Sequence, residues 1–459
     1  MLFRSIDVQY YIYHLDTTGG LLTAALLRAA DRGVRVRMLL DDGDTVAGDE
    51  KLLALEAHPN IELRVFNPFV DGGHSNLVRA VEVALSAGRA DYRMHNKLLV
   101  VDNAIALAGG RNVGDEYFQV DPVTHFGDDD VVAAGPVVRE MSASFDEYWN
   151  SELAVPAGAL KGRSRPSGNP APQPSAQQRL HELRETLATA ARAPAPAQRE
   201  ALERMARGEP LVGLRDGRLP LTWAPAQLVY DSPDKRREMT SGGFSSIEPV
   251  RAAIAAVKSE LLIVTPFLVP EPEDLALLEQ LRQRGVTVRV LTNSLAATPE
   301  SAVHSAYQRY RAPLLERGMH LYEVRPHPAD GAGPPDTAST APAARFALHA
   351  KLFVFDRQRL FVGSLNLDRR SARRNTEIGL LIDSPELARA TAEHFATMTR
   401  PENCYALRLL PAAPGQAPSL VWLTRHDGQL VALDRDPARG PWQRLAVQLL
   451  SLLPLDNEL

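Results

Sequence analysis

Two segments in opposite halves of this sequence repeat the same spacing of polar residues. The first runs from residue 93 to 112 and the second from 347 to 366. Each contains His-x-Lys, four further residues, Asp, six further residues, Gly, then Gly or Ser, one residue and Asn. The matching residues are His95, Lys97, Asp102, Gly109 and Asn112 in the first segment, and His349, Lys351, Asp356, Gly363, Ser364 and Asn366 in the second. One match could arise by chance, but two indicate an internal duplication, so the chain should fold as two similar halves.

The regions around these segments repeat as well. Residues 32–39, RGVRVRML, return as residues 284–291, RGVTVRVL. In each half the pattern predicts a strand, a helix that ends at a Gly, and a second strand, which is a βαβ unit with parallel strands. The predicted first strands are 6–13 and 261–268, and the predicted helices are 21–32 and 274–284. We therefore expect an α/β fold of two duplicated half-domains, each a mixed, mostly parallel sheet flanked by helices, with a site at their interface.

Each His-x-Lys precedes a short apolar run, residues 98–101 and 352–355, which predicts a strand buried on both faces. Side chains alternate along a strand, so the His and the Lys of each segment lie on the same side. Two imidazoles and two ammonium groups suit a phosphate: one imidazole can attack phosphorus, the other can protonate the leaving oxygen, and the lysines can hold the phosphoryl oxygens. This chemistry needs no metal and no cofactor. The alternative, two core histidines and two edge lysines, is disfavoured by the duplication.

With these twin motifs the sequence resembles the phospholipase D superfamily, over nearly the whole chain. Its flanking segments are most similar to bacterial cardiolipin synthases of the C-type branch, and they are residues 6–12, 109–118, 230–235 and 442–453. One departure is Gly127, where these enzymes often carry Arg. The resemblance implies a phosphatidyltransferase: a histidine attacks one phospholipid to form a phosphohistidine, and the hydroxyl of a second phospholipid resolves it to give cardiolipin. With water as the acceptor, the enzyme would be a phospholipase D hydrolase.

The resemblance also implies roles for individual residues. His95 is the expected nucleophile and His349 the expected general acid. An imidazole attacks through one nitrogen only if an acceptor holds the other, so each should have a carboxylate partner. By the resemblance that role falls to Glu377, and the comparable carboxylate of the first half is expected to be Asp130, with Asp128 as the alternative.

Further residues are expected to support the site. Asn112, Ser364 and Asn366 close the two motifs, and only the second copy offers a hydroxyl. Asp102 and Asp356 belong to the motif residues of the catalytic set. They follow the buried runs, however, and we interpret them as groups that hold the loop with Gly and Asn. Arg369 and Arg370, in a run with four arginines, are candidate clamps for a headgroup or second phosphate, the alternative being a solvated helix face.

Composition bears on the substrate. A net charge of -5 and 6% aromatic residues argue against a nucleic-acid phosphodiesterase, which would need a basic groove with stacking aromatics. We expect glycerophospholipids, anionic or zwitterionic, as substrates, and a peripheral position on a bacterial cell membrane. An inactive membrane-associated scaffold is the non-enzymatic alternative, and the two complete motifs argue against it. The single Cys404 excludes an intrachain disulfide framework.

Composition and pattern also divide the chain. We expect half-domain 1 over residues 1–154, a Pro- and Ala-rich, partly helical linker over 155–219, half-domain 2 over 220–410, and a C-terminal hairpin with an amphipathic helix over 411–459. Half 2 has a predicted helix at 247–258 before its first strand, and half 1 has no counterpart. This difference favours a natural chain with a longer N-terminus that could carry an export or anchoring signal.

Overall fold

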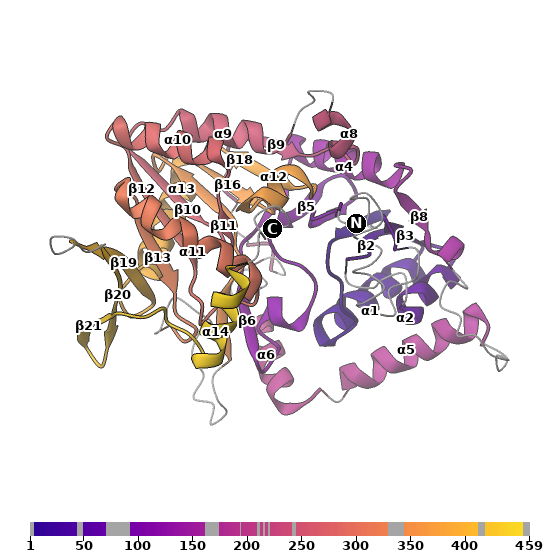
Figure 1. The fold of residues 1–459 in the computed structure, drawn as a ribbon. Helices are drawn as coiled ribbons and strands as arrows, with labels where there is room; N and C mark the ends of the chain where they lie inside the picture. Colours follow the sequence, from indigo (N-terminus) through magenta and orange to yellow (C-terminus); the bar gives the residue numbers. More distant parts are fainter. Residues whose placement is uncertain are drawn as a thin grey trace.

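The structure is a computed structural model, and it describes residues 4–43, 49–69, 92–160, 174–192, 194–208, 212–213, 216–218, 221–240, 245–328, 344–411 and 418–452. Its two large sheets lie side by side, one from each half of the sequence (Figure 1). The duplication read from the two motifs is therefore visible in the architecture. The Pro-rich tracts at 165–175 and 327–344 fall largely outside the described residues.

The sheet of the first half has the strand order β7-β5-β4-β1-β2-β3-β8 among the described residues. Its strands are β1 (Ser5–Tyr10), β2 (Arg35–Asp41), β3 (Ile61–Phe66), β4 (Leu98–Val101), β5 (Ile105–Gly109), β7 (Asp130–Ala134) and β8 (Ala154–Pro156). Only β1, β2 and β3 run parallel, with α1 (Thr17–Asp31) as the crossover after β1. The other neighbours pair antiparallel. The sheet is mixed as expected, but the expectation that it is mostly parallel is wrong.

The sheet of the second half repeats this arrangement and extends it at both edges, in the order β21-β20-β19-β13-β12-β10-β15-β16-β18-β9. Its strands are β9 (Ala226–Tyr230), β10 (Glu260–Val264), β12 (Thr287–Asn293), β13 (His320–Val324), β15 (Leu352–Phe355), β16 (Arg359–Gly363), β18 (Ile378–Ile382), β19 (Cys404–Leu410), β20 (Ser419–His426) and β21 (Gln429–Leu433). Again only the three strands that follow the βαβ pattern, β10, β12 and β13, are parallel. The expected C-terminal hairpin is β20 and β21, and it continues this sheet through β19.

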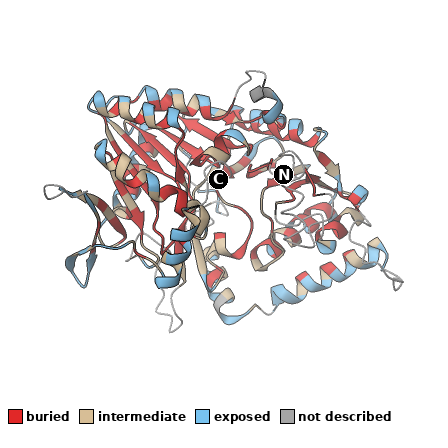
Figure 2. Ribbon diagram, in the orientation of Figure 1, coloured by how far each residue is buried: buried red, intermediate tan, exposed pale blue. Residues whose placement is uncertain are grey.

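One hydrophobic core joins the two halves. It contains residues from both sheets together with the inner faces of α4 (Pro136–Trp149) and α13 (Pro385–Met398). In the chain, α4 follows β7 and α13 follows β18. A second core lies on the other face of the second sheet, under α9 (Ile247–Ala255), α10 (Pro272–Gln283) and α11 (Ser301–Glu316). A third lies on the corresponding face of the first sheet, under α1. Figure 2 shows these buried layers within the exposed outer helices.

The linker contributes to the first half. Its predicted helix is α5 (Ala176–Arg192), and Leu180, Leu183 and Leu187 on one face are buried in the core under α1. Their helical spacing places them on a single stripe of the helix. α6 (Pro196–Arg207) follows, and Figure 1 shows that the two helices run along the lower edge of the molecule.

Two short contacts tie the halves together at their interface. Strand β6 (Thr124–Gly127) of the first half pairs in parallel with β14 (Arg345–Leu348), which leads into the second motif. Met94, which precedes the first motif histidine, forms an isolated bridge with Thr376 of the second half. Both motifs therefore begin with backbone that is hydrogen-bonded to the opposite half.

Candidate active site

The first motif histidine is held by the second half of the chain. His95 lies just before β4, and its backbone N–H donates to the carbonyl of Thr376 at 2.9 Å. Its ring nitrogen Nδ1 lies 2.8 Å from the Glu377 carboxylate, which is fully buried at the start of β18. The contact leaves Nε2 as the free nitrogen of this imidazole.

The second histidine is held by the first half in the same way. The N–H groups of His349 and Ala350 donate to the carbonyl of Gly127, and His349 Nδ1 lies 2.5 Å from Asp128 Oδ2. At Gly127 a Cβ atom would lie 2.5 Å from the ring of Phe346, so a side chain there would require that ring to move. Gly127 therefore permits the close packing of β6 on β14.

The structure places the alternative carboxylate Asp128, and not Asp130, at a site histidine. Asp130, the expected partner in the first half, pairs instead with Arg111, whose Nε lies 2.8 Å from its carboxylate. Asp128 contacts His349 instead. Strand β6 pairs with β14 of the second half, and this pairing brings the next residue, Asp128, to the second motif. Each carboxylate also serves the histidine of the opposite half, Glu377 that of half 1 and Asp128 that of half 2.

Aromatic rings hold both imidazoles from the side. Tyr11 lies edge-on to His95 with 5.1 Å between ring centroids. Phe126 stacks on His349 at 5.5 Å, and Tyr117 meets the same imidazole edge-on at 5.2 Å. These contacts and the carboxylates restrict ring rotation, so each Nε2 points in one direction.

The two lysines lie beside the histidines and are almost fully buried. Lys351 Nζ lies 2.9 Å and 3.1 Å from the two ring nitrogens of His349. Lys97 Nζ donates to the His95 carbonyl and lies 5.3 Å from the centre of the Tyr11 ring. Burial lowers the pKa of Lys97 well below its usual value, and the second cause is Lys351, so the two ammonium groups face one region.

Burial and positive neighbours keep the imidazoles neutral. Burial followed by Lys97 lowers the pKa of His95 well below its usual range. Burial and Lys351 lower the pKa of His349 to about 4, although Asp128 opposes the shift. Burial alone would raise the pKa of Asp128, but His349 and Lys351 lower it to about 2. The site therefore combines two neutral imidazoles, an ionised Asp128 carboxylate and two buried lysines.

The ends of the two motifs differ for a steric reason. Ser364 donates its hydroxyl hydrogen bond to Glu377, the carboxylate that holds His95. At the equivalent Gly110, a Cβ atom would lie 2.1 Å from Asp128 Oδ1. The shorter Asp128 needs that space to reach His349, so a Ser at this position of the first motif would collide with it.

The two motif asparagines are buried beside the site. Asn112 accepts from the N–H of Ile12 and donates to the hydroxyl of Tyr117, which contacts His349. The N–H of Asn366 donates to the Ser371 hydroxyl, while its side-chain oxygen is buried without a hydrogen-bond partner. Asn112 therefore positions a ring at the histidine, and Asn366 presents a buried polar atom close to the second motif.

The motif carboxylates Asp102 and Asp356 have no contact with the histidines. Asp102 accepts from the N–H groups of Arg4 and Ser5, at the start of β1. Asp356 accepts from the N–H groups at 258–260, at the start of β10. Both take the left-handed conformation, with φ of 54° and 53°. They close the turn after the motif strand and fix the neighbouring strand, rather than holding the Gly and Asn loop.

Several positioning residues escaped the sequence interpretation. Lys235 is fully buried, and its ammonium group contacts Asp231 and the carbonyls of Ser371 and Asn375. Asp231 in turn accepts from the N–H of Glu377. The sequence signals were the resemblance of residues 230–235 and the four-residue spacing of an Asp and a Lys after β9, and neither distinguishes a buried pair from an exposed one.

A second positioning pair is related by the duplication. At the end of β2, Asp41 accepts from the N–H of Met94, and at the end of β12, Asn293 accepts from the N–H of Leu348. Each of these side chains therefore accepts a backbone hydrogen bond from the residue immediately before a motif histidine. The sequence repeat aligns the ends of β2 and β12 with each other, but it does not indicate that either end forms this hydrogen bond.

The arginine run forms α12 (Arg369–Arg373), capped by Asp368. Arg370 is among the positive groups that lower the pKa of His95, so its guanidinium faces the site. Arg373 pairs instead with Glu271. Of the two expected clamps, Arg370 therefore has an electrostatic contact with a site histidine.

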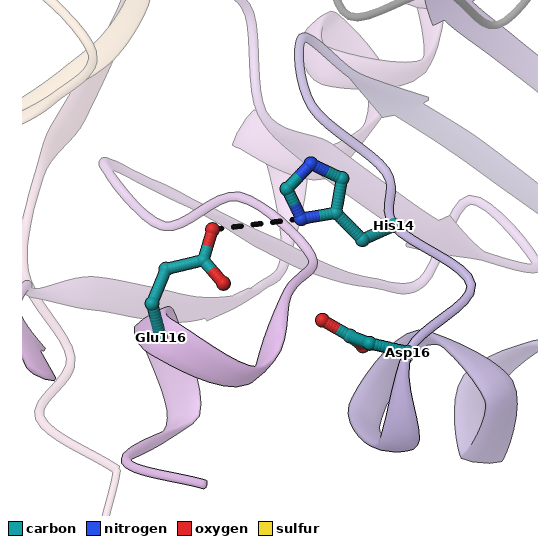
Figure 3. A group of neighbouring side chains, drawn as sticks. All are labelled: His14, Asp16 and Glu116. Carbon is teal, nitrogen blue, oxygen red and sulfur yellow. Dashed lines mark ion pairs between the residues drawn. The ribbon is translucent and has the colours of Figure 1, made fainter. Parts of the chain in front are cut away.

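One group outside the histidine site has side chains of the types that bind cations. His14, Asp16 and Glu116 have ligand atoms within 4.8 Å of one another, with His14 Nδ1 3.5 Å from Glu116 Oε1 (Figure 3). The Asp16 oxygens, however, already accept from the N–H groups of Gly19 and Asp115, because Asp16 caps α1. The capping role therefore accounts for the position of the Asp16 carboxylate, and no cation is needed to explain it.

We expect EDTA to leave turnover within about twofold of the untreated enzyme, since two imidazoles and two lysines supply nucleophile, acid and charge stabilisation. Activity is measured after dialysis against the chelator and again after Mg²⁺, Ca²⁺ or Zn²⁺ is restored. Strong inhibition that a divalent ion reverses would contradict the metal-independent chemistry, and His14→Ala would then test the group in Figure 3.

The chain is similar to proteins of known family. The family described as "Cardiolipin synthase, PLD-like domain" matches residues 4–149 and 250–399. "Cardiolipin synthase C" of Escherichia coli is 35% identical over 99% of this chain and 90% of its own length. A "Cardiolipin synthase" of Halalkalibacterium halodurans is 23% identical over 83% of this chain and 58% of its own. The solved phosphatidylserine synthase of Haemophilus influenzae shares the fold, with a TM-score of 0.53 at 14% identity over 87% of this chain and 82% of its own.

Among the described residues, none of the helices combines the length and the apolar character that crossing a bilayer requires.

Proposed function

Because this chain belongs to the cardiolipin synthase, PLD-like family of the phospholipase D superfamily, we propose that it makes cardiolipin by transferring a phosphatidyl group between two phospholipids. The observation that carries the proposal is the pair of imidazoles with Nδ1 held by Glu377 and Asp128 at the interface of the halves. Their buried lysine neighbours suit the phosphodiester that every glycerophospholipid presents. Similarity to cardiolipin synthases, rather than site geometry, selects the lipid.

In the proposed reaction His95 is the nucleophile. Its Nε2 attacks the phosphorus of the donor lipid, and the bond to the headgroup oxygen breaks as His349 delivers a proton to that oxygen. The phosphatidyl group is then on His95. In the second step the free hydroxyl of phosphatidylglycerol loses its proton to His349 and attacks phosphorus, which releases cardiolipin and restores both imidazoles. Lys97 and Lys351 balance the charge on the phosphoryl oxygens.

The electrostatics favour this division of labour. Burial and the neighbouring Lys97 lower the pKa of His95 well below its usual range, so this imidazole is neutral and keeps a lone pair for attack. Asp128 raises the pKa of His349, and a bound phosphodiester adds a second negative charge that favours the protonated imidazole. His349 is therefore the better acid once substrate has entered, and Arg370 is positioned for a second phosphate or headgroup.

We expect kcat/KM to fall as pH rises above about 8. Burial lowers the pKa of Lys351 to about 8, so the free enzyme loses this positive charge in that range. The pH dependence of kcat/KM reports groups of the free enzyme. Lys351→Arg should move the alkaline limb to higher pH whatever its effect on the maximal rate, because arginine stays protonated. If the alkaline limb of kcat/KM stays at the same pH in this variant, the limb reports the ionisation of a group other than Lys351.

The test of the function is lipid analysis of a cardiolipin-deficient bacterium that expresses the full-length protein. We expect cardiolipin to return, and not to return with His349→Ala expressed at the same level. Phosphatidic acid without cardiolipin would indicate hydrolysis in place of transfer. No phosphatidyl-transfer product, together with degradation of DNA by the purified protein at low salt, would favour a nuclease.

A further inference from the structure

The C-terminal helix presents an apolar face that no described residue covers. In α14 (Pro441–Leu450) only Val447 is buried. Trp442 and Leu449 are 79% and 58% exposed, Leu445 is also exposed, and Leu452 in the following turn is 79% exposed. Spacings of three and four residues put these side chains on one stripe, opposite Val447. We call these four residues the apolar stripe.

The helix itself is firmly attached to the second half. Gln443 donates to the carbonyl of Leu295 at 2.7 Å, and Arg309 donates to the carbonyl of Ser451 at 2.6 Å. Val447 packs inward, toward α11. Since both ends are fixed, the outward direction of the apolar stripe is set by the fold, and Figure 2 colours much of this helix as exposed.

Beside the start of α14 lies a cavity of about 540 Å³ with a cationic lining. Arg345, Arg439, Arg444 and His327 line it, and its other lining residues include no carboxylate. Arg345 Nε is buried without a hydrogen-bond partner. Burial and the neighbouring Arg439 also lower the pKa of Arg345, so the positive charges of these two lining residues repel each other. We call this cavity the arginine pocket.

Charge and position identify the occupant. Residues 437–455 contain two arginines and no Asp or Glu, in a chain whose net charge is -5. The acidic residue nearest in sequence, Asp436, is already used by Arg311 and His304. Guanidinium groups match phosphate oxygens, and a Trp with leucines beside basic residues suits the boundary between headgroups and acyl chains.

We propose that the apolar stripe and the arginine pocket form one docking surface for an anionic bilayer. The stripe enters the acyl boundary while the pocket binds the phosphate of an anionic glycerophospholipid. Arg345 lies in β14, four residues before His349, so the lipid-bound surface is continuous with the strand that carries the second motif. The inference deepens the proposed function, since it rests on a lipid substrate, but it concerns binding and is measured without turnover.

Flotation of the full chain with vesicles tests the docking surface. We expect at least about tenfold stronger binding to vesicles of phosphatidylcholine with 30% phosphatidylglycerol than to phosphatidylcholine alone, reduced by salt. The double variant Trp442→Ala, Leu449→Ala should weaken binding to both kinds about tenfold or more. Arg345→Gln with Arg439→Gln should remove the preference for the anionic vesicle while leaving the weak binding to neutral vesicles.

Matched controls lie elsewhere on the surface. Trp223 is 76% exposed and the Arg207 side chain 80% exposed, so Trp223→Ala and Arg207→Gln should bind as the parent does. Equal losses in control and test variants, or no loss in either, would overturn the proposal. Binding of inorganic phosphate without binding of vesicles would also overturn it, because the pocket would then hold a free anion only. Thermal unfolding identifies any variant that fails to fold.

The same samples separate this inference from the proposed function. Vesicle binding with the expected pattern but without phosphatidyl transfer would leave the docking surface in place and reject the cardiolipin synthase assignment. Phosphatidyl transfer to lipid in detergent micelles, with no binding to vesicles, would support the cardiolipin synthase assignment and reject the docking surface.

Discussion

Replacing His95 with Ala is expected to reduce phosphatidyl transfer by at least about four orders of magnitude. The imidazole forms the covalent bond to phosphorus in the proposed reaction, and His349, the other imidazole of the site, is assigned the role of the acid. Removing the ring also leaves the Glu377 carboxylate buried without its partner at 2.8 Å. Initial rates with lipid in micelles measure the effect. His426→Ala, on an exposed hairpin, is the matched control and should keep parental rates.

A trapped intermediate tests which histidine is the nucleophile. We expect acid-sensitive label from a donor with labelled phosphate on His95 in the parent, and accumulated label on His95 in His349→Ala if slow attack still occurs. Label on His349 would reverse the two roles. Full turnover by His95→Ala, with no label on either histidine, would contradict covalent catalysis at this site.

The sequence predicted the pairing of His with Lys because that depends only on strand periodicity. The contact that holds each imidazole depends instead on how the halves pack. His95 and Glu377 are 282 residues apart, and nothing local indicates that β18 of one half meets the first motif of the other. Similarly, Asp128 and Asp130 are two residues apart, so the alternation of side chains along a strand would place both on the same side. The choice between them follows from β6 joining β14, a contact between halves that periodicity does not reveal.

The sheets are mixed as expected, and the sequence also contains the reason that they are not mostly parallel. A parallel connection needs a crossover of about a dozen residues, and the βαβ units supply it for β1, β2 and β3. Between β4 and β5 there are only residues 102–104, with Asp102 and Asn103 in the left-handed region. So short a turn forces an antiparallel hairpin. It also explains why the motif Asp is conserved between the two copies of this chain: it accepts backbone N–H groups at that turn.

Replacing Asp128 with Asn is expected to lower kcat by about 10²- to 10⁴-fold while changing KM little. The amide keeps the shape of the side chain and fits beside Gly110, but it cannot stabilise a protonated His349. Without that carboxylate the pKa of His349 falls further, since Asp128 is the group that raises it. The acid that serves the leaving oxygen is then seldom protonated. Steady-state rates and an NMR titration of His349 measure the two effects.

Asp130→Asn is the matched control, since it makes the same change two residues away at the Arg111 ion pair. We expect a loss of stability there, visible as a lower Tm, with kcat within about tenfold of the parent, because exposed or partly exposed ion pairs contribute little to a distant reaction. A purely structural role for Asp128 would instead lower Tm in both variants and leave the titration of His349 where it was. If Asp130→Asn proved the more damaging to kcat at unchanged Tm, the carboxylate that matters would be the one first expected from the sequence, and the contact between Asp128 and His349 would have to change when substrate binds.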